Sequence, residues 1–203
     1  MKEKIIFATK NRGKIKEINM IMKDTDYEVI SMEDAGIDID IVEDGSTFLE
    51  NAIIKAKEVK KFTECIVMAD DSGLEVDYLD KAPGIYSARF GGENTSYKVK
   101  NEMIMDKLEG VEEKDRTARF VCAIATVFPD GEILTTRGTI EGIITHEERG
   151  NNGFGYDPIF YVPEYSCTTA EMDNESKNRI SHRGKALRSM KSKMESYRNG
   201  SNK

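Results

Sequence analysis

The stretch CIVMADDSGLEVD at residues 65–77 joins an apolar run to two adjacent carboxylates, Asp70 and Asp71. The apolar residues 65–69 predict a buried strand, and we expect the two carboxylates to lie where that strand ends. Two anions forced together raise each other's pKa or bind a divalent cation, and ligation by oxygen alone favours Mg²⁺ over zinc or copper. The alternative is that Asp-Ser-Gly simply opens a turn. The stretch therefore indicates a strand-based fold, with either a magnesium site or a turn at this point.

Strand and helix patterns alternate before this stretch. Residues 5–8 form another buried-strand pattern, followed by a loop and a helical pattern over residues 13–22. Thr47 and Glu50 have capping-box spacing ahead of a helix whose apolar positions continue to Val59. This helix leads directly into the strand at residue 65.

After the strand at residue 65, a helix is expected that is capped by Asn94 or Thr95 and ends near Gly110. A hairpin of two long strands is then expected over residues 116–128 and 132–144. A final helix is expected to be capped by Ser181. Pro129-Asp130-Gly131 supplies the turn of the hairpin. No internal repeat and no Pro- or Ser-rich linker divides the chain. The predicted class is mixed α/β, with residues 1–203 as a single domain.

The composition of the chain indicates a folded protein and argues against some classes of binding partner. The chain has 203 residues, of which 38% are apolar and 33% are charged, so it can bury a substantial core. Its formal net charge of -7 and pI near 5.1 argue against binding to duplex nucleic acid or to an anionic membrane. A local basic pocket can still hold a small anion, and a polyanionic ligand would need concentrated lysines and arginines.

Cysteine and histidine usage points to a cytoplasmic protein without a zinc site. The three cysteines have no C-x-x-C spacing and read as reduced residues, two of them within apolar runs. Two histidines argue against a zinc site built on imidazoles. The longest apolar-rich run, residues 120–128, is far too short to span a membrane.

The loop ATKNRGK at residues 8–14 lies between a buried strand and a helix start. Backbone N–H groups at a helix N-terminus, a glycine and three cations are what a phosphate group requires. The spacing matches neither the Walker A motif nor the dinucleotide fingerprint. A solvated basic turn is the alternative.

Two later segments suit a nucleobase. In GNNGFGYDPIF, residues 150–160, glycines flank Phe154, so its ring can stand clear of the backbone and stack on a planar base, while Asp157 can contact the base edge. The alternative is a glycine-rich turn with a core aromatic residue. In KNRISHRG, residues 177–184, His182 and Arg183 lie at a predicted helix start, which suits either ligand binding or a solvated basic helix start.

Taken in order, six segments make the chain resemble the inosine triphosphate pyrophosphatase family, also described as dITP/XTP pyrophosphatases. They are ATKNRGKIKEI, EDGSTFLENAIIKA, ADDSGLEVDYLDKAPGIYSARFGG, DRTARFVCAIA, GFGYDPIF and ISHRGKAL, and they cover nearly the whole chain. The resemblance implies Mg²⁺-dependent hydrolysis of ITP, dITP and XTP to the monophosphate and pyrophosphate by a homodimer. It also implies an elongated mixed β-sheet flanked by helices, in two lobes with an active-site cleft between them.

The resemblance assigns roles residue by residue. The phosphate-binding loop is Thr9, Lys10, Asn11, Arg12, Gly13 and Lys14. The metal-associated carboxylates are Glu43 and Asp71, with Asp71 also the base and Ser72 a substrate contact. The base-binding segment is Phe154, Gly155, Tyr156 and Asp157, and the remaining nucleobase contacts are Lys177, His182 and Arg183. One departure is Ser166-Cys167-Thr168-Thr169, which replaces a more usual Gly-Lys-Thr stretch.

These roles predict a mechanism. Asp71 is expected to deprotonate a water that attacks the α-phosphorus, and Arg183 or His182 is expected to donate to the 6-keto oxygen of the base.

Three alternative functions remain. One is a nucleotide-binding regulator, which would not need both Glu43 and Asp71. Another is an aspartyl-phosphate hydrolase, which usually has D-x-D after its first strand. The third is a Maf-like pyrophosphatase for modified pyrimidine triphosphates.

Overall fold

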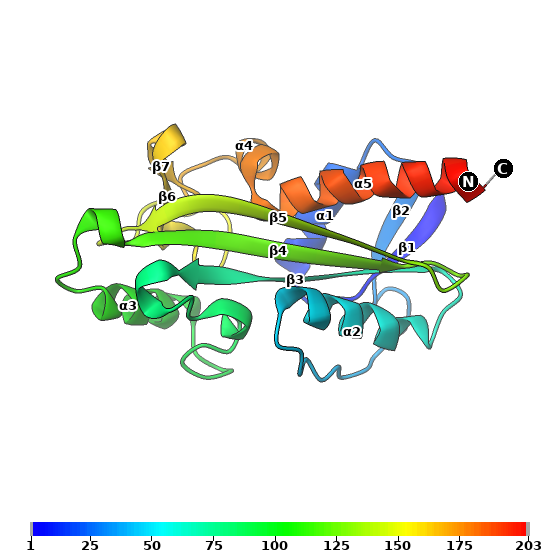
Figure 1. Cartoon of the computed structure of the whole chain (residues 1–203), viewed down its shortest axis with the longest axis horizontal. Coiled ribbons are helices and arrows are strands. Elements are labelled where there is room, and N and C mark those ends of the chain that lie inside the picture. Colours follow the sequence, from blue (N-terminus) through cyan, green and yellow to red (C-terminus); the bar gives the residue numbers. More distant parts are fainter. Residues whose placement is uncertain (1, 202–203) are drawn as a thin grey trace. The chain divides into compact units, whose positions relative to one another are not determined.

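The fold is a mixed sheet flanked by helices, seen in a computed structural model that describes residues 2–201 (Figure 1). Its strands are β1 (Glu3–Phe7), β2 (Tyr27–Ser31), β3 (Ile66–Val76), β4 (Thr117–Val127), β5 (Ile133–Ile144), β6 (Phe160–Val162) and β7 (Cys167–Thr168). Its helices are α1 (Arg12–Met22), α2 (Phe48–Lys60), α3 (Tyr97–Lys107), α4 (Asn174–Ile180) and α5 (His182–Ser201).

Over the described residues, the seven strands pair in the order β2-β1-β3-β4-β5-β6-β7. β1 runs parallel to β2 and β3, whereas β6 runs antiparallel to β5 and β7. The predicted mixed α/β class is therefore confirmed.

The chain forms two compact units. Unit 1 comprises the chain up to Asp71, Cys122–Gly138 and the chain from His182 onward, whereas unit 2 comprises Ser72–Val121 and Thr139–Ser181. Two units agree in number with the two lobes that the resemblance implies.

Unit 1 has a core on each face of its strands. On one face, Phe7 and Met68 pack in a cluster with Ile18 of α1 and Leu187 of α5. On the other face, the neighbouring strand residues pack in a second cluster with Ala52 and other residues of α2. Because successive side chains of a strand point to opposite faces, α1 and α5 cover one face and α2 covers the other (Figure 1).

Unit 2 has a core of its own, in which α3 contributes Ile104 and the strands contribute Leu74, Phe120 and Phe160. The rings of Phe120 and Phe160 lie 4.4 Å apart between centroids. The second half of β3 packs into this core, where Leu74 and Val76 are fully buried.

Most predicted elements are present. Thr47 caps α2 by accepting from the Glu50 N–H at 3.1 Å, and the turn after Phe128 has Gly131 at a φ of +90°. α3 is capped by Ser96 instead of Asn94 or Thr95, because Ser96 is the residue whose hydroxyl accepts from the Val99 N–H. α4 was not predicted, and α5 begins directly after Ser181 as expected.

The expectation that β3 ends at the carboxylates is wrong. The strand continues through Asp70-Asp71-Ser72-Gly73 to Val76. A buried carboxylate is tolerated within a strand when a cation pairs with it, and both aspartates have such partners.

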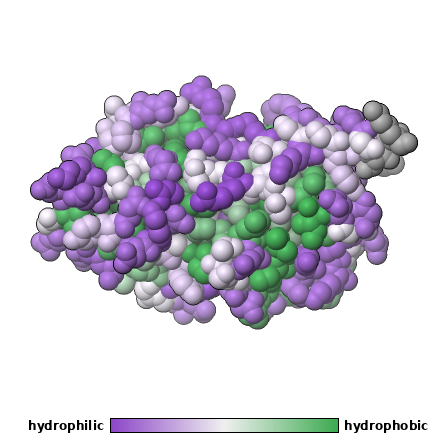
Figure 2. All heavy atoms as spheres, viewed as in Figure 1, coloured by the Kyte–Doolittle hydropathy of each residue, from purple (hydrophilic) through white to green (hydrophobic). Residues whose placement is uncertain are grey.

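The surface mixes polar and apolar side chains. Figure 2 shows an apolar area in the region where Figure 1 places α2, whose Leu49 is 39% exposed.

Within residues 2–201, no helix has both the length and the apolar character needed to cross a membrane.

Candidate functional site

The alternation of β3 sends its two aspartates to opposite faces. Asp70 lies on the face of α1 and α5, where it pairs with Lys14 and Arg183, whereas Asp71 lies on the face of α2, where it pairs with Lys55. The interpretation of Asp70 and Asp71 as one ligating pair is therefore wrong. Each aspartate organises a separate cluster of unit 1.

The Asp71 cluster joins a loop, a helix and a strand. Lys55 of α2 contacts Glu43 Oε2 at 2.7 Å and Asp71 Oδ1 at 3.3 Å. Asn51, one turn earlier on α2, donates to Asp71 Oδ2 at 3.1 Å. Both oxygens of Asp71 therefore face donors on α2.

Burial and neighbouring charges together shift the pKa values of this cluster. Burial raises the pKa of Asp71 above its ordinary value, although Lys55 opposes the shift. Burial alone would lower the pKa of Lys55, but the surrounding carboxylates, led by Asp71, outweigh it and raise that pKa. A carboxylate whose pKa is raised is a stronger proton acceptor than an ordinary aspartate, which suits a general base.

The donor set of this cluster fits Mg²⁺. Glu43 and Asp71 converge on a single cation, the Lys55 ammonium, so their oxygens point to one region. Among the described residues, no group of three or more His, Cys, Asp or Glu side chains could hold a metal ion. Mg²⁺ commonly uses one or two carboxylates together with substrate phosphates. The two predicted ligands therefore fit a cation that is bound together with a phosphate ligand.

The Asp70 cluster is a buried ion network on the opposite face. Lys14 Nζ lies 2.9 Å from Asp70 Oδ1, and Arg183 Nε lies 3.2 Å from Asp70 Oδ2. Arg183 also pairs with Glu17 of α1. Burial alone would raise the pKa of Asp70, but Lys14 and Arg183 hold it well below its usual range. Two predicted ligand contacts, Lys14 and Arg183, are thus anchored by one carboxylate.

Side chains of the predicted phosphate loop bond to the loop's own backbone N–H groups. Asn11 Oδ1 accepts from the N–H groups of Gly13 at 2.9 Å and Lys14 at 3.2 Å, and Thr9 Oγ1 accepts from the Asn11 N–H at 3.1 Å. Two of the N–H groups expected to bind phosphate therefore already have partners. An anion at this loop would therefore be bound mainly by the cationic side chains of the loop.

Those cations differ in their surroundings. Lys10 Nζ lies 3.2 Å from both Asp38 and Asp40, and the hydrogen bond to Asp40 is the main reason that its pKa is raised. Arg12 is exposed and has no ion-pair partner within residues 2–201. Arg12 is therefore available to an incoming anion.

In unit 2, Asp157 organises the predicted base-binding segment. Its Oδ2 accepts from the Phe154 N–H and from Lys177 Nζ, both at 2.8 Å, and its Oδ1 accepts from Thr169 Oγ1 at 2.8 Å. Lys177 Nζ also lies 4.8 Å from the centre of the Phe154 ring. A Cβ at Gly153 would lie 2.2 Å from Asp157 Oδ2, so glycine is required there. Asp157 thus holds Phe154 and Lys177 in place.

The remaining predicted residues are distributed over both units. Tyr156 is buried, donates to the Ser87 carbonyl at 2.8 Å and packs edge-on against Tyr97. Ser72 follows Asp71 in β3 as the first residue of unit 2, and His182 is buried at the start of α5 in unit 1.

Sequence reasoning missed Asn51 and Lys55. Both occupy buried positions of α2, four residues apart, in a face otherwise formed by Phe48, Ala52, Ala56 and Val59. Polar residues within a buried helical face need partners, so this placement is the signal that could have found them.

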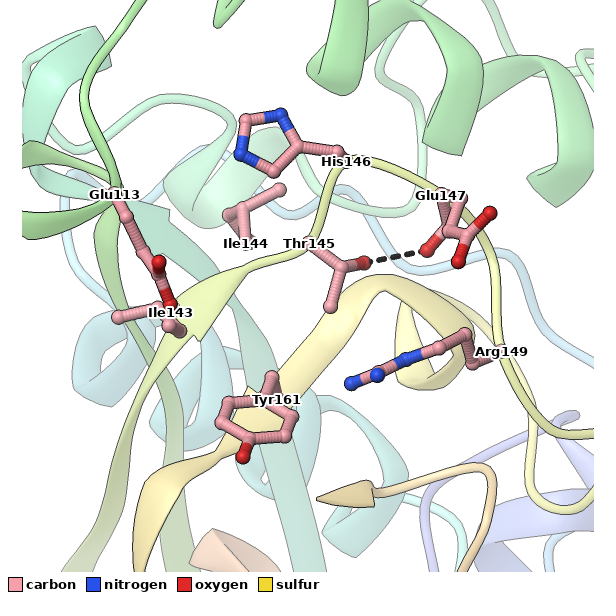
Figure 3. A pocket seen from close by; sticks show the side chains of 8 residues that line it. All are labelled: Glu113, Ile143, Ile144, Thr145, His146, Glu147, Arg149 and Tyr161. Atoms are coloured by element: carbon pink, nitrogen blue, oxygen red, sulfur yellow. Dashed lines mark hydrogen bonds between the residues drawn. The ribbon is translucent and has the colours of Figure 1, made fainter. Parts of the chain in front are cut away.

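A separate cavity of about 380 Å³ lies in unit 2 and contains no predicted site residue. Figure 3 shows its lining, in which Glu113 and Glu147 accompany Arg149 and Tyr161. Arg149 lies over the Tyr161 ring, 5.1 Å from its centre. With two carboxylates and one arginine that is already stacked, this cavity is poorly suited to a polyphosphate.

Comparisons with known proteins agree over nearly the whole chain. The model of the Ham1 family matches residues 5–193. A dITP/XTP pyrophosphatase from Clostridium perfringens is 49% identical over 195 residues, which cover 93% of this chain and 96% of that protein. One from Desulforamulus reducens is 51% identical over 185 residues, covering 91% of this chain and 92% of that protein.

Solved structures agree as well. The Ham1 protein of Staphylococcus aureus is similar with a TM-score of 0.85 and 44% identity, covering 96% of this chain and 100% of that chain. A HAM1 protein from Coxiella burnetii is similar with a TM-score of 0.87 and 40% identity, covering 96% of this chain and 99% of that chain.

Proposed function

Since the chain belongs to the Ham1 family, we propose that it is a pyrophosphatase that hydrolyses dITP, XTP and ITP to the nucleoside monophosphate and pyrophosphate. The observation that carries the proposal is the Asp71 cluster, in which the buried Asp71 carboxylate and Glu43 both contact the Lys55 ammonium. This cluster combines a proton acceptor, the Asp71 carboxylate, with the Lys55 ammonium, which offsets the negative charge of the two carboxylates.

Asp71 accepts a proton from water as the water oxygen forms a bond to the α-phosphorus and the bond from phosphorus to the pyrophosphate oxygen breaks. Glu43 and Asp71 are the residues that would hold Mg²⁺, which would supply positive charge against the leaving pyrophosphate. Arg12 and Lys14 add cationic charge from the first loop, and Lys55 keeps the two carboxylates close without a net repulsion.

The base is bound by groups of a different kind. Phe154 stacks on its plane, and donors among Lys177, His182 and Arg183 bond to the 6-keto oxygen of hypoxanthine or xanthine. Adenine has an amino group at that position, which would oppose such a donor. This difference supports a preference for deaminated purines.

Product analysis tests the proposal. The purified chain is incubated with Mg²⁺ and, separately, ITP, dITP, XTP, ATP, GTP and a modified pyrimidine triphosphate, and the nucleotides are separated by anion-exchange chromatography. We expect monophosphate and pyrophosphate, formed fastest from ITP, dITP and XTP. Diphosphate and inorganic phosphate as products, or turnover of the pyrimidine alone, would overturn it.

A further inference from the structure

Asn51 is a buried asparagine of α2 that bonds to two other segments at once. It is 1% exposed, its Oδ1 accepts from the Gly45 N–H at 2.9 Å, and its Nδ2 donates to Asp71 Oδ2 at 3.1 Å. Gly45 follows Glu43 by two residues. Asn51 therefore connects the loop that carries one predicted ligand to the strand that carries the other.

The partners of Asn51 determine how its amide is turned. A backbone N–H can only donate, so the group that faces Gly45 is the carbonyl oxygen. The NH₂ group then faces Asp71, where it can donate to the carboxylate. One orientation of the amide therefore satisfies both partners, with the carbonyl oxygen at Gly45 and the NH₂ group at Asp71.

The loop comes this close because residue 45 is glycine. A Cβ at Gly45 would lie 2.7 Å from Asn51 Oδ1 and 2.8 Å from the Glu50 Cβ, which is closer than real Cβ contacts come. The backbone of Gly45 is outside the left-handed region, so the need for glycine is one of space. Alanine there would push the loop away from Asn51.

A second attachment lies beside the first. Glu50 Oε2 accepts from both the N–H and the hydroxyl of Ser46, each at 2.7 Å. The loop after Glu43 is thus fastened to the first turn of α2, and Lys55 contacts Glu43 and Asp71 one turn later. α2 therefore sets where both carboxylates lie.

We propose that Asn51 is a positioning residue that fixes the separation and orientation of Glu43 and Asp71 for cation binding and water activation. The inference rests on the proposed pyrophosphatase function. By donating to Oδ2, Asn51 prevents the Asp71 carboxylate from rotating and leaves Oδ1 directed toward Lys55. Its loss should affect the chemical step and cation binding more than nucleotide affinity.

Two variants test this from opposite ends. Asn51→Leu removes both hydrogen bonds with no change in charge, and Gly45→Ala displaces the loop without touching the core. For each we measure kcat and KM with ITP, the binding of Mn²⁺ alone by electron paramagnetic resonance, and unfolding in urea. We expect kcat to fall by about 10- to 100-fold, KM to change much less, and Mn²⁺ binding to weaken in both.

Two controls separate positioning from general damage. Val42→Ala changes a side chain of the same loop that is 75% exposed, and it should leave all three readouts unchanged. Thr25→Val removes a buried hydroxyl of the same unit, which donates to the Met22 carbonyl at 2.7 Å, and should lower stability but not kcat.

The outcomes separate this inference from the proposed function. If the parent chain forms no monophosphate and pyrophosphate, the proposed function fails, while Mn²⁺ binding still tests Asn51. If the parent is active but Gly45→Ala and Asn51→Leu bind Mn²⁺ normally, or lose activity only in KM, the positioning role is refuted. If Asn51→Leu does not fold, Gly45→Ala decides.

Discussion

Asp71 combines burial with donors on both of its oxygens. Burial favours the neutral acid, whereas Lys55 and Asn51 favour the carboxylate. The balance leaves a carboxylate that accepts a proton more readily than an exposed aspartate and still stays in a fixed orientation. At the scale of one residue, this balance is the basis of the proposed chemistry.

Replacing Asp71 with asparagine should abolish most turnover without unfolding the chain. The amide keeps the shape of the side chain but cannot accept the proton, and a lost general base typically lowers the rate by roughly 10²- to 10⁴-fold. The check is kcat for ITP together with unfolding in urea. The exposed neighbour variant Asp44→Asn is the matched control. Near-parental kcat in Asp71→Asn would show that another group is the base.

Phe154 supports a second prediction at this scale. Stacking on a base is worth roughly 1–3 kcal/mol and is indifferent to base identity, so Phe154→Ala should lower kcat/KM for ITP, XTP and ATP by similar factors of about 5- to 150-fold. Phe62→Ala, a change at a phenylalanine that is 59% exposed, should have no effect. A loss confined to one base would mean that Phe154 selects instead of stacking.

At the scale of an element, β3 shows what the sequence could and could not predict. The apolar run 65–69 predicts the strand, and the structure confirms it, with alternate residues packed in two cores. Nothing local shows that the strand continues through two aspartates. That depends on Lys14 and Arg183 from α1 and α5 and on Lys55 from α2, residues far away in the sequence.

The ion network on one face of β3 predicts a large effect on stability. In Arg183→Met, Asp70 and Glu17 lose a buried partner, and removing one member of a buried pair costs about 3–5 kcal/mol of unfolding free energy. Urea unfolding measures this loss, with the exposed Arg188→Met as control. Unchanged stability would contradict this prediction, whereas a fall in the ratio of ITP to ATP turnover would support the proposed contact of Arg183 with the base.

α3 offers a prediction that depends on pH. Lys100 is 2% exposed, donates to the Ala88 carbonyl and has no carboxylate partner among the described residues, and burial lowers its pKa below 10.5. The charged ammonium therefore destabilises the folded state at neutral pH, and this cost disappears as pH rises through the lowered pKa toward 10.5.

Lys100→Met should therefore be more stable than the parent at neutral pH, and the difference should shrink as the pH approaches about 10. Urea unfolding at both pH values measures it, with Lys98→Met on the exposed side of α3 as control. A difference that is independent of pH would show that the gain comes from packing alone.

At the scale of the whole molecule, the sequence predicts the fold class, but it does not predict the partners of each candidate site residue. Hydrophobic periodicity predicts the longer strands and helices but not β2, β6, β7 or α4, and the ordered motifs give the candidate residues. The partners of Asp157 could not be predicted in the same way, because Thr169 and Lys177 reach it from separate segments of unit 2. Pairing of this kind is set by tertiary structure.

The chain should keep its fold when divalent cations are removed. Glu43 and Asp71 already share Lys55 as a cationic partner, so their repulsion is compensated without a metal ion. Dialysis against EDTA should therefore abolish pyrophosphate release and leave the thermal midpoint of unfolding nearly unchanged, and adding Mg²⁺ should restore the activity. A ligand that binds only the folded state raises its stability by an amount that grows with the logarithm of the ligand concentration divided by Kd. A midpoint that falls by several degrees on chelation would therefore reveal a tightly bound structural ion instead of one that acts with the substrate.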